Sequence, residues 1–124
     1  MEGVMRKFTC LSILFLVVAL SELTIGAPQS DVEKKKIEFL LNQIANLKGA
    51  KFWRNGSSHS PKEAVDHLRM KWTKAGGSVK TAQDFIQKIA SKSSVSGKAY
   101  EIEFADGKKT ELKDFLYQKL ESFK

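Results

Sequence analysis

Hydrophobic residues recur every three or four positions in four stretches of the chain, the spacing of helices with one buried face. Two of these stretches begin with a capping box, in which a hydroxyl residue is followed three positions later by glutamate: Ser30 with Glu33, and Ser60 with Glu63. Pro61 then takes the first helical position, where its missing N–H costs nothing. The sequence therefore predicts helices over 30–49, 60–76, 81–90 and 110–124.

The period changes to two over 100–104, where apolar residues alternate with glutamates, as in a strand with one face in water. A shorter alternation over 51–54 is the expected partner strand. It is followed by Asn55-Gly56, a strong turn signal, and we expect 57–59 to continue as a loop to the next helix. The predicted fold is mainly helical α+β, with about four helices around one core and a small antiparallel β-ribbon.

The beginning of the chain has the order of a secretory signal peptide. Arg6 and Lys7 precede an apolar run over 8–20, which is shorter than the roughly 20 residues of a membrane-spanning helix. A more polar stretch then ends at Ala27. We therefore expect a signal peptide over 1–27, cleavage after Ala27, and a single small globular domain over 28–124 with no membrane span.

The net charge and the cysteine content of the segment after the predicted leader limit which kinds of site and partner it can have. The chain has a formal net charge of +7, and the predicted leader contributes none of it because its acidic and basic residues balance. The one cysteine, Cys10, lies in the leader, so disulfides and cysteine-type zinc sites are excluded from the rest. We expect no cofactor and no nucleic-acid partner, because the lysines are dispersed without interleaved aromatics. An anionic envelope polymer, a lipid head group or an acidic protein is the expected partner, unless the charge serves solubility alone.

The stretch "FWRNGSSHSPKEAVDHL" over 52–68 holds the only two histidines, His59 and His67, and they flank Glu63 symmetrically. These three side chains are weak metal-ligand candidates, because His59 precedes the helix cap and the histidines are eight rather than four positions apart. We therefore predict no metal site. In a second interpretation, Arg54, His59 and the side-chain amide of Asn55 grip a carboxylate or phosphate beside the N–H groups that begin the helix.

The stretch "SKSSVSGKAY" over 91–100 is the second candidate region. Its hydroxyls are typical of a tight connection whose side chains bond the backbone. Ser94 or Ser96 as a nucleophile, with a lysine or histidine as base, is the alternative, although no spacing demands it. Lys98 is not a P-loop lysine, because no hydroxyl residue follows it.

The two stretches together resemble the YfeK-like family of small exported bacterial proteins, a domain of unknown function. The segment 52–71, which contains the first stretch, is similar to an aromatic-aliphatic-Arg-Asn-Gly motif followed by His, Glu-Ala and His-Leu-x-x-Lys. The segment 81–102, which contains the second stretch, is similar to Thr-Ala-acidic-x-Phe-Ile followed by Ser-Ser-x-Ser/Thr-Gly-Lys-Pro-Tyr. Trp53, Gln83 and Ala99 depart from these motifs. The matching positions are Arg54, Asn55, Gly56, His59, Glu63, His67, Lys71, Ser94, Ser96, Gly97, Lys98 and Tyr100.

The resemblance implies a bacterial protein secreted across the inner membrane into the periplasm, and it implies that the two stretches meet in the fold. Our first hypothesis is a non-enzymatic module that binds an anionic ligand or an envelope partner. The alternative is a small hydrolase that uses His59 or His67 with the serine loop or with a bound metal. We assign no catalytic residue. The candidate ligand-binding residues are Arg54, Asn55, His59, His67, Ser94, Ser96, Lys98 and Tyr100.

Overall fold

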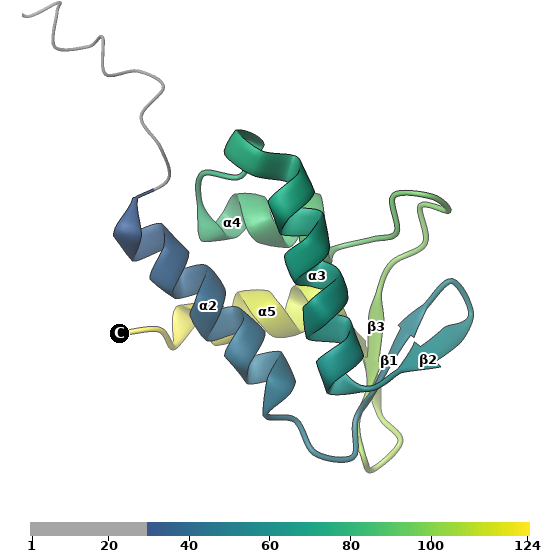
Figure 1. The fold of residues 1–124 in the computed structure, drawn as a ribbon. Helices are drawn as coiled ribbons and strands as arrows, with labels where there is room; N and C mark the ends of the chain where they lie inside the picture. The colour runs from purple at the N-terminus through teal and green to yellow at the C-terminus, as the bar shows by residue number, and fades with distance from the viewer. Residues whose placement is uncertain (1–29) are drawn as a thin grey trace, which may run out of the picture.

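The computed structural model describes residues 30–124 (Figure 1), and the predicted signal peptide lies outside these described residues. Its helices are α2 (Asp31–Ala45), α3 (Pro61–Ala75), the 3-10 turn η1 (Gly76–Ser78), α4 (Ala82–Asp84), the π-helix η2 (Phe85–Ala90) and α5 (Leu112–Glu121). Its strands are β1 (Lys51–Arg54), β2 (Ser57–His59), β3 (Glu101–Glu103) and β4 (Lys109–Glu111). The predicted mainly helical α+β class is confirmed. The third predicted helix is a short α-helical turn continued by the π-helix.

The strands form one antiparallel sheet in the order β2-β1-β3-β4. The predicted ribbon is its centre, where Phe52 of β1 pairs with Ile102 of β3. The expectation of a loop over 57–59 is wrong, because these residues pair with β1 as an edge strand. The two strands that the sequence pattern does not predict are β2, "SSH", and β4, "KTE". Neither has an apolar alternation, because both depend on pairing with a neighbouring strand rather than on a buried face of their own.

The turn between β1 and β2 has the conformation that Asn55-Gly56 predicts. Asn55 has φ 52° and Gly56 has φ 81°, so both central residues lie in the left-handed region. Two such residues give the type I′ turn, whose twist matches that of the two strands it joins. The hairpin directs the end of β2 straight into Ser60, the cap of α3.

The helices lie on one side of the sheet, with α3 crossing beside β1 and β2 (Figure 1). Phe52 and Ile102 turn inward from the sheet and join one buried cluster with the apolar faces of the helices. Leu68 of α3, Phe85 of η2 and Leu116 of α5 are at most 2% exposed in this cluster. The periodic stripes seen in the sequence are therefore the core-facing stripes of the helices.

Two helix starts differ from the sequence prediction. Glu33 does not complete a capping box at Ser30; its Oε1 instead accepts a hydrogen bond of 2.7 Å from the N–H of Ala82, which begins α4. The last helix begins at Leu112 rather than at 110, because Thr110 is held in β4 opposite Ile102. Tertiary pairing overrides the local signal in both places.

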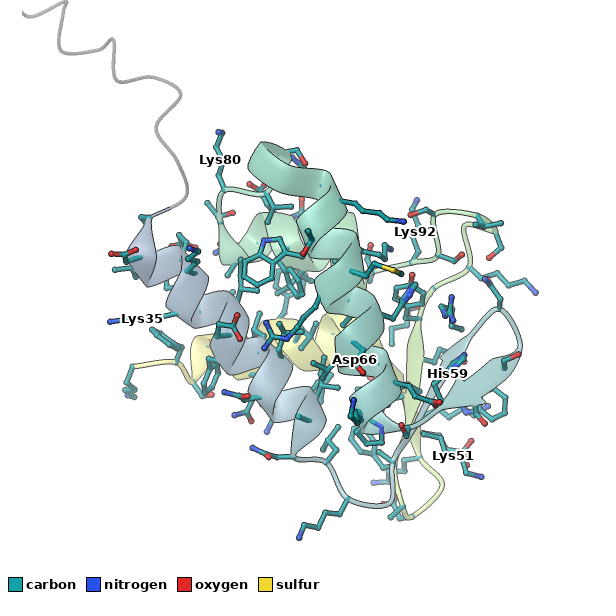
Figure 2. All side chains as sticks on the ribbon, viewed as in Figure 1. Lys35, Lys51, His59, Asp66, Lys80 and Lys92 are labelled. Atoms are coloured by element: carbon teal, nitrogen blue, oxygen red, sulfur yellow. The ribbon has the colours of Figure 1, made fainter. Side chains whose placement is uncertain are left out.

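Within 30–124, no helix is both long enough and apolar enough to cross a membrane. Lysines extend from several sides of the molecule, as Lys35, Lys51, Lys80 and Lys92 illustrate in Figure 2. The positive charge is therefore distributed rather than gathered into one stripe.

Candidate functional site

The inner face of the sheet brings polar residues next to the core. Arg54 lies two positions along β1 from the buried Phe52, so both point to the same face. Trp53 between them points to the opposite face, where its Nε1 donates to Glu103 at 3.1 Å. Continuing the β1–β3 register by one residue places Arg54 opposite Tyr100. The alternation of side chains along β1 therefore places the guanidinium of Arg54 beside the phenol ring of Tyr100, next to the buried core.

Helix α3 supplies the second wall of the site. Glu63 and His67 are four residues apart and share one helix face, as do Ala64 and Leu68. The capping box at Ser60 fixes where α3 begins: its Oγ accepts from the Glu63 N–H at 3.1 Å, and its N–H donates to Glu63 Oε1 at 2.9 Å. This cap occupies the N–H groups of Ser60 and Glu63, two of the groups at the helix end where the sequence suggests an anion grip.

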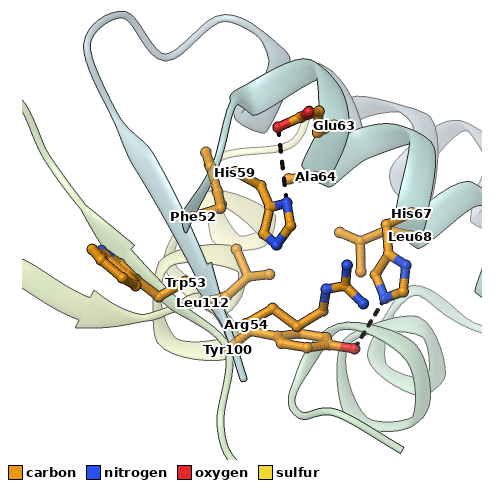
Figure 3. A pocket seen from close by; sticks show the side chains of 10 residues that line it. All are labelled: Phe52, Trp53, Arg54, His59, Glu63, Ala64, His67, Leu68, Tyr100 and Leu112. Atoms are coloured by element: carbon orange, nitrogen blue, oxygen red, sulfur yellow. Dashed lines mark hydrogen bonds and ion pairs between the residues drawn. The ribbon is translucent and has the colours of Figure 1, made fainter. Parts of the chain in front are cut away.

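A pocket opens between β1, β2 and α3 (Figure 3). Half of its lining residues belong to the buried core and form an apolar floor: Phe52, Ala64, Leu68, Tyr100 and Leu112. The remaining lining residues are Trp53 and four charged or titratable residues, Arg54, His59, Glu63 and His67. The pocket is small, with a cavity volume of about 30 Å³.

A chain of polar contacts runs along one wall. Lys71 Nζ donates to the Tyr100 hydroxyl at 2.9 Å and to the Lys92 carbonyl oxygen at 3.1 Å. His67 Nε2 lies 3.3 Å from the same hydroxyl. An ammonium group only donates, so the Tyr100 oxygen accepts from Lys71 and its own O–H is free to donate to a neutral His67. Lys71 was absent from the predicted ligand-binding set, and its place in the family motif was the only signal for it.

Arg54 is the unpaired group of the pocket. Its side chain is half-buried and extends beside Tyr100 toward His67 (Figure 3). Among residues 30–124, no side chain or carbonyl forms a hydrogen bond or ion pair with its guanidinium. By contrast, the guanidinium of Arg69, which is exposed, is held by both carboxylate oxygens of Glu38 at 2.8 and 2.6 Å. Arg54 thus has five donors and no acceptor within the described chain.

The pKa values of three residues beside Arg54 are shifted, by burial and by its positive charge. Burial, followed by the charge of Arg54, lowers the pKa of His67 and also that of Lys71. Burial raises the pKa of Tyr100, while Arg54 acts in the opposite direction. Burial is the larger cause of each shift, and the positive charge of Arg54 adds to it at His67 and Lys71 only. A bound anion would offset these two like-charge interactions.

His59 folds back from the end of β2 toward α3. Its Nδ1 lies 3.8 Å from Glu63 Oε1, an ion pair only when the imidazole is protonated. Within 30–124, no three His, Cys, Asp or Glu side chains are gathered closely enough to hold a metal ion. The trio of His59, Glu63 and His67 therefore does not converge on one point.

The serine loop meets the β1–β2 turn, as the resemblance implies. The Ser96 hydroxyl donates to Asn55 Oδ1. The buried Ser93 organises the loop, because its Oγ accepts from the N–H groups of residues 95 and 96, both at 3.2 Å. Ser94 and Lys98 are exposed and do not line the pocket. The hydroxyls of this loop thus bond mainly backbone, as the simpler interpretation predicts.

The predicted residues therefore divide into three groups. Arg54, His59, His67 and Tyr100 line one pocket. Asn55 and Ser96 join the turn to the loop beside it. The remaining two stand apart on the loop surface: Ser94 and Lys98.

Fold and site together define a small α+β protein with a pocket between an antiparallel sheet and a helix, lined by an arginine, a glutamate and two histidines over an apolar floor. The chain belongs to the family of unknown function DUF5329, whose profile matches residues 31–124. It is similar to the uncharacterized protein YfeK of Salmonella typhimurium, with 36% identity over 96 residues that cover 77% of each chain. No solved structure matches the chain. The predicted YfeK-like relationship is thus confirmed.

Proposed function

We propose that this protein is a non-enzymatic periplasmic module that binds a small anion, or the anionic group of an envelope partner, in the pocket between β1 and α3. The observation that supports the proposal is the half-buried, unpaired guanidinium of Arg54. A buried or half-buried arginine is ordinarily paired, because an unpaired charge loses water without gaining a counterion. An arginine that remains unpaired inside a pocket is a site prepared for an external acceptor.

The groups around Arg54 suit such a ligand. A planar guanidinium offers two parallel donors to a carboxylate or phosphate. The Tyr100 hydroxyl and the imidazole of His67 stand beside it, and Lys71 holds the hydroxyl in place from outside the pocket. Protonation of His67 adds a second positive charge, so we expect anion binding to strengthen as the pH falls through the histidine range.

No observation favours the hydrolase alternative. Within 30–124, neither His59 nor His67 forms a hydrogen bond with Ser94 or Ser96, and Ser96 donates to Asn55 instead. A serine nucleophile needs a base within reach of its hydroxyl. Binding without chemistry therefore accounts for the described contacts with fewer assumptions.

Periplasmic residence is part of the proposal and rests on the signal-peptide pattern over 1–27. Its test is the N-terminus of the protein recovered from a periplasmic extract of a bacterial host. A chain that begins at Pro28 supports export with cleavage after Ala27. A chain recovered uncleaved from the cytoplasm overturns this part of the proposal.

Anion binding is tested by following the amide and histidine ring signals of the protein in NMR during titration with acetate and with inorganic phosphate at constant ionic strength. We expect saturable shifts at Arg54, His67 and Tyr100. Arg54→Met, which keeps the apolar stem, should abolish them. The matched control is Arg69→Met, which removes the same charge outside the pocket and should leave the shifts unchanged. Equal loss in both variants, or no saturable shift, contradicts the proposal.

A further inference from the structure

The chemistry of the pocket also restricts which anion it takes. We propose that the ligand is an apolar monocarboxylate: a single carboxylate carried on a small hydrocarbon group. This inference rests on the proposed anion-binding function and names its ligand class. The charge of the lining, the apolar floor and the size of the space each support it.

Charge matching favours one negative charge. Arg54 is the one lining residue whose positive charge is independent of pH in the physiological range. Burial and neighbouring cations lower the pKa of His67, which favours its neutral form. Glu63 stands on the opposite side of the pocket, where it repels additional negative charge. A carboxylate is matched by one guanidinium, whereas a phosphate monoester carries roughly −1.5 to −2 charges near pH 7.

The floor favours a hydrocarbon group beside that charge. Phe52, Leu68 and Leu112 are 2 to 5% exposed, and the pocket opens directly onto them. Their exposed atoms offer contact surface and no hydrogen bond. A hydrated inorganic anion would leave this surface wet, whereas an apolar substituent of the ligand would cover it.

The size of the space limits the group. The pocket is small, with a cavity volume of about 30 Å³, so it covers only the first few carbons of a hydrocarbon chain. Longer chains must continue outside the pocket. Each buried methylene should tighten binding about fourfold. We therefore expect about a 15-fold gain from acetate to butanoate, which adds two methylenes, and a much smaller gain from butanoate to hexanoate.

Two sources share this chemistry: a short fatty acid, and a peptide whose last residue is apolar. The test measures dissociation constants by NMR for acetate, butanoate and hexanoate, for butanamide as the uncharged match of butanoate, and for butyl phosphate as the doubly charged match. Acetyl-glycyl-valine represents the peptide end. Butanoate and acetyl-glycyl-valine both support the class, and the tighter of the two identifies the source.

The outcomes separate this inference from the proposed function. If butanoate binds about 15-fold tighter than acetate, clearly tighter than butanamide and tighter than butyl phosphate, the inference stands. If anions bind in an Arg54-dependent way but acetate equals butanoate, or butyl phosphate binds tighter, the ligand class is wrong and the proposed function stands. If no anion binds, both fail.

A variant that fills the floor gives an independent readout. Ala64 is 9% exposed in the pocket floor, and Ala64→Leu should remove the gain from acetate to butanoate while retaining acetate binding. Asp66→Leu, on the exposed side of the same helix, is the matched control and should retain the gain. An unchanged chain-length dependence in a folded Ala64→Leu variant overturns the inference. If Ala64→Leu does not fold, the ligand series above decides alone.

Discussion

Replacing Arg54 by methionine should stabilise the protein, which is unusual for the loss of a half-buried polar residue. Within 30–124 the guanidinium makes no hydrogen bond or ion pair that the substitution could remove. Its charge acts against Lys71 and His67, as the lowered pKa values of both groups indicate. Methionine keeps most of the apolar stem that lies along Tyr100, so little packing is lost.

The magnitude follows from the exposure of the charges. Interactions between partly exposed charges are worth about 0.2–1 kcal/mol, because water screens them. Removing the repulsion should therefore raise the free energy of unfolding by about 0.5 kcal/mol. For a domain of this size, that corresponds to an increase in Tm of about 2–4 °C. Arg69→Met should shift the free energy by a similar amount in the opposite direction, since it breaks the two-point contact with Glu38.

Urea unfolding near pH 7, followed by far-UV circular dichroism, measures both variants against the wild type. Added salt provides an internal check, because at about 1 M the Debye length falls to about 3 Å and both differences should shrink. The reasoning is refuted if Arg54→Met lowers the free energy of unfolding by about 1 kcal/mol or more. Arg54 would then hold the fold together, and the unpaired guanidinium would not mark a ligand site.

Three further predictions concern the same region. Tyr100→Phe keeps the ring and removes the hydroxyl that contacts Lys71 and His67, so it should lower the free energy of unfolding in urea by about 1 kcal/mol. Tyr117→Phe removes a hydroxyl that accepts from the exposed Gln87, so it should lower this free energy clearly less. Asn55→Ala should lower the free energy of unfolding by about 1–2 kcal/mol, because alanine disfavours φ 52°. Asn55→Gly removes that strain but loses the contact with Ser96, so it should lower the free energy of unfolding by less. Equal losses would show that the side-chain contact dominates. The pKa of His67 is lower in the folded protein than in the unfolded chain, so the folded protein binds fewer protons there. Above about pH 6.5 the imidazole is neutral in both states and the free energy of unfolding is at its full value. As the pH falls through the folded-state pKa, this contribution to stability is lost. Urea unfolding from about pH 7.5 to 5 should therefore show a decline that His67→Gln reduces, and an identical decline in that variant would contradict the assignment.

Particular elements show which local signals were sufficient. The capping box at Ser60, the proline after it and the apolar stripe of α3 agree with one another, and the helix forms where they place it. The pair Asn55-Gly56 specifies a turn that few other pairs can adopt, and it has the expected positive φ angles. Strand β2 was missed because three polar residues carry no periodic signal. Their pairing depends on β1, which the local sequence does not show.

The candidate site shows a similar division. The residue types and the family motif singled out Arg54, His59, His67 and Tyr100, and they do line one pocket. The same reasoning included Ser94 and Lys98, which stand apart on the loop, and it left out Lys71. Motif membership indicates that a residue matters to the family without indicating what it contacts.

The sequence by itself determined the positions of the four helical segments to within a few residues, the central ribbon and the turn, because capping, periodicity and turn chemistry act between residues that are close along the chain. It also determined the residue types available for an anion site. Only the tertiary structure decided that Arg54 faces Tyr100 across the sheet, that Glu33 caps α4 rather than its own helix, and that Lys71 reaches Tyr100 from outside the pocket. Lys71 and Tyr100 are 29 positions apart, and Glu33 and Ala82 are 49 positions apart. The geometry of such long-range contacts depends on how the helices pack onto the sheet.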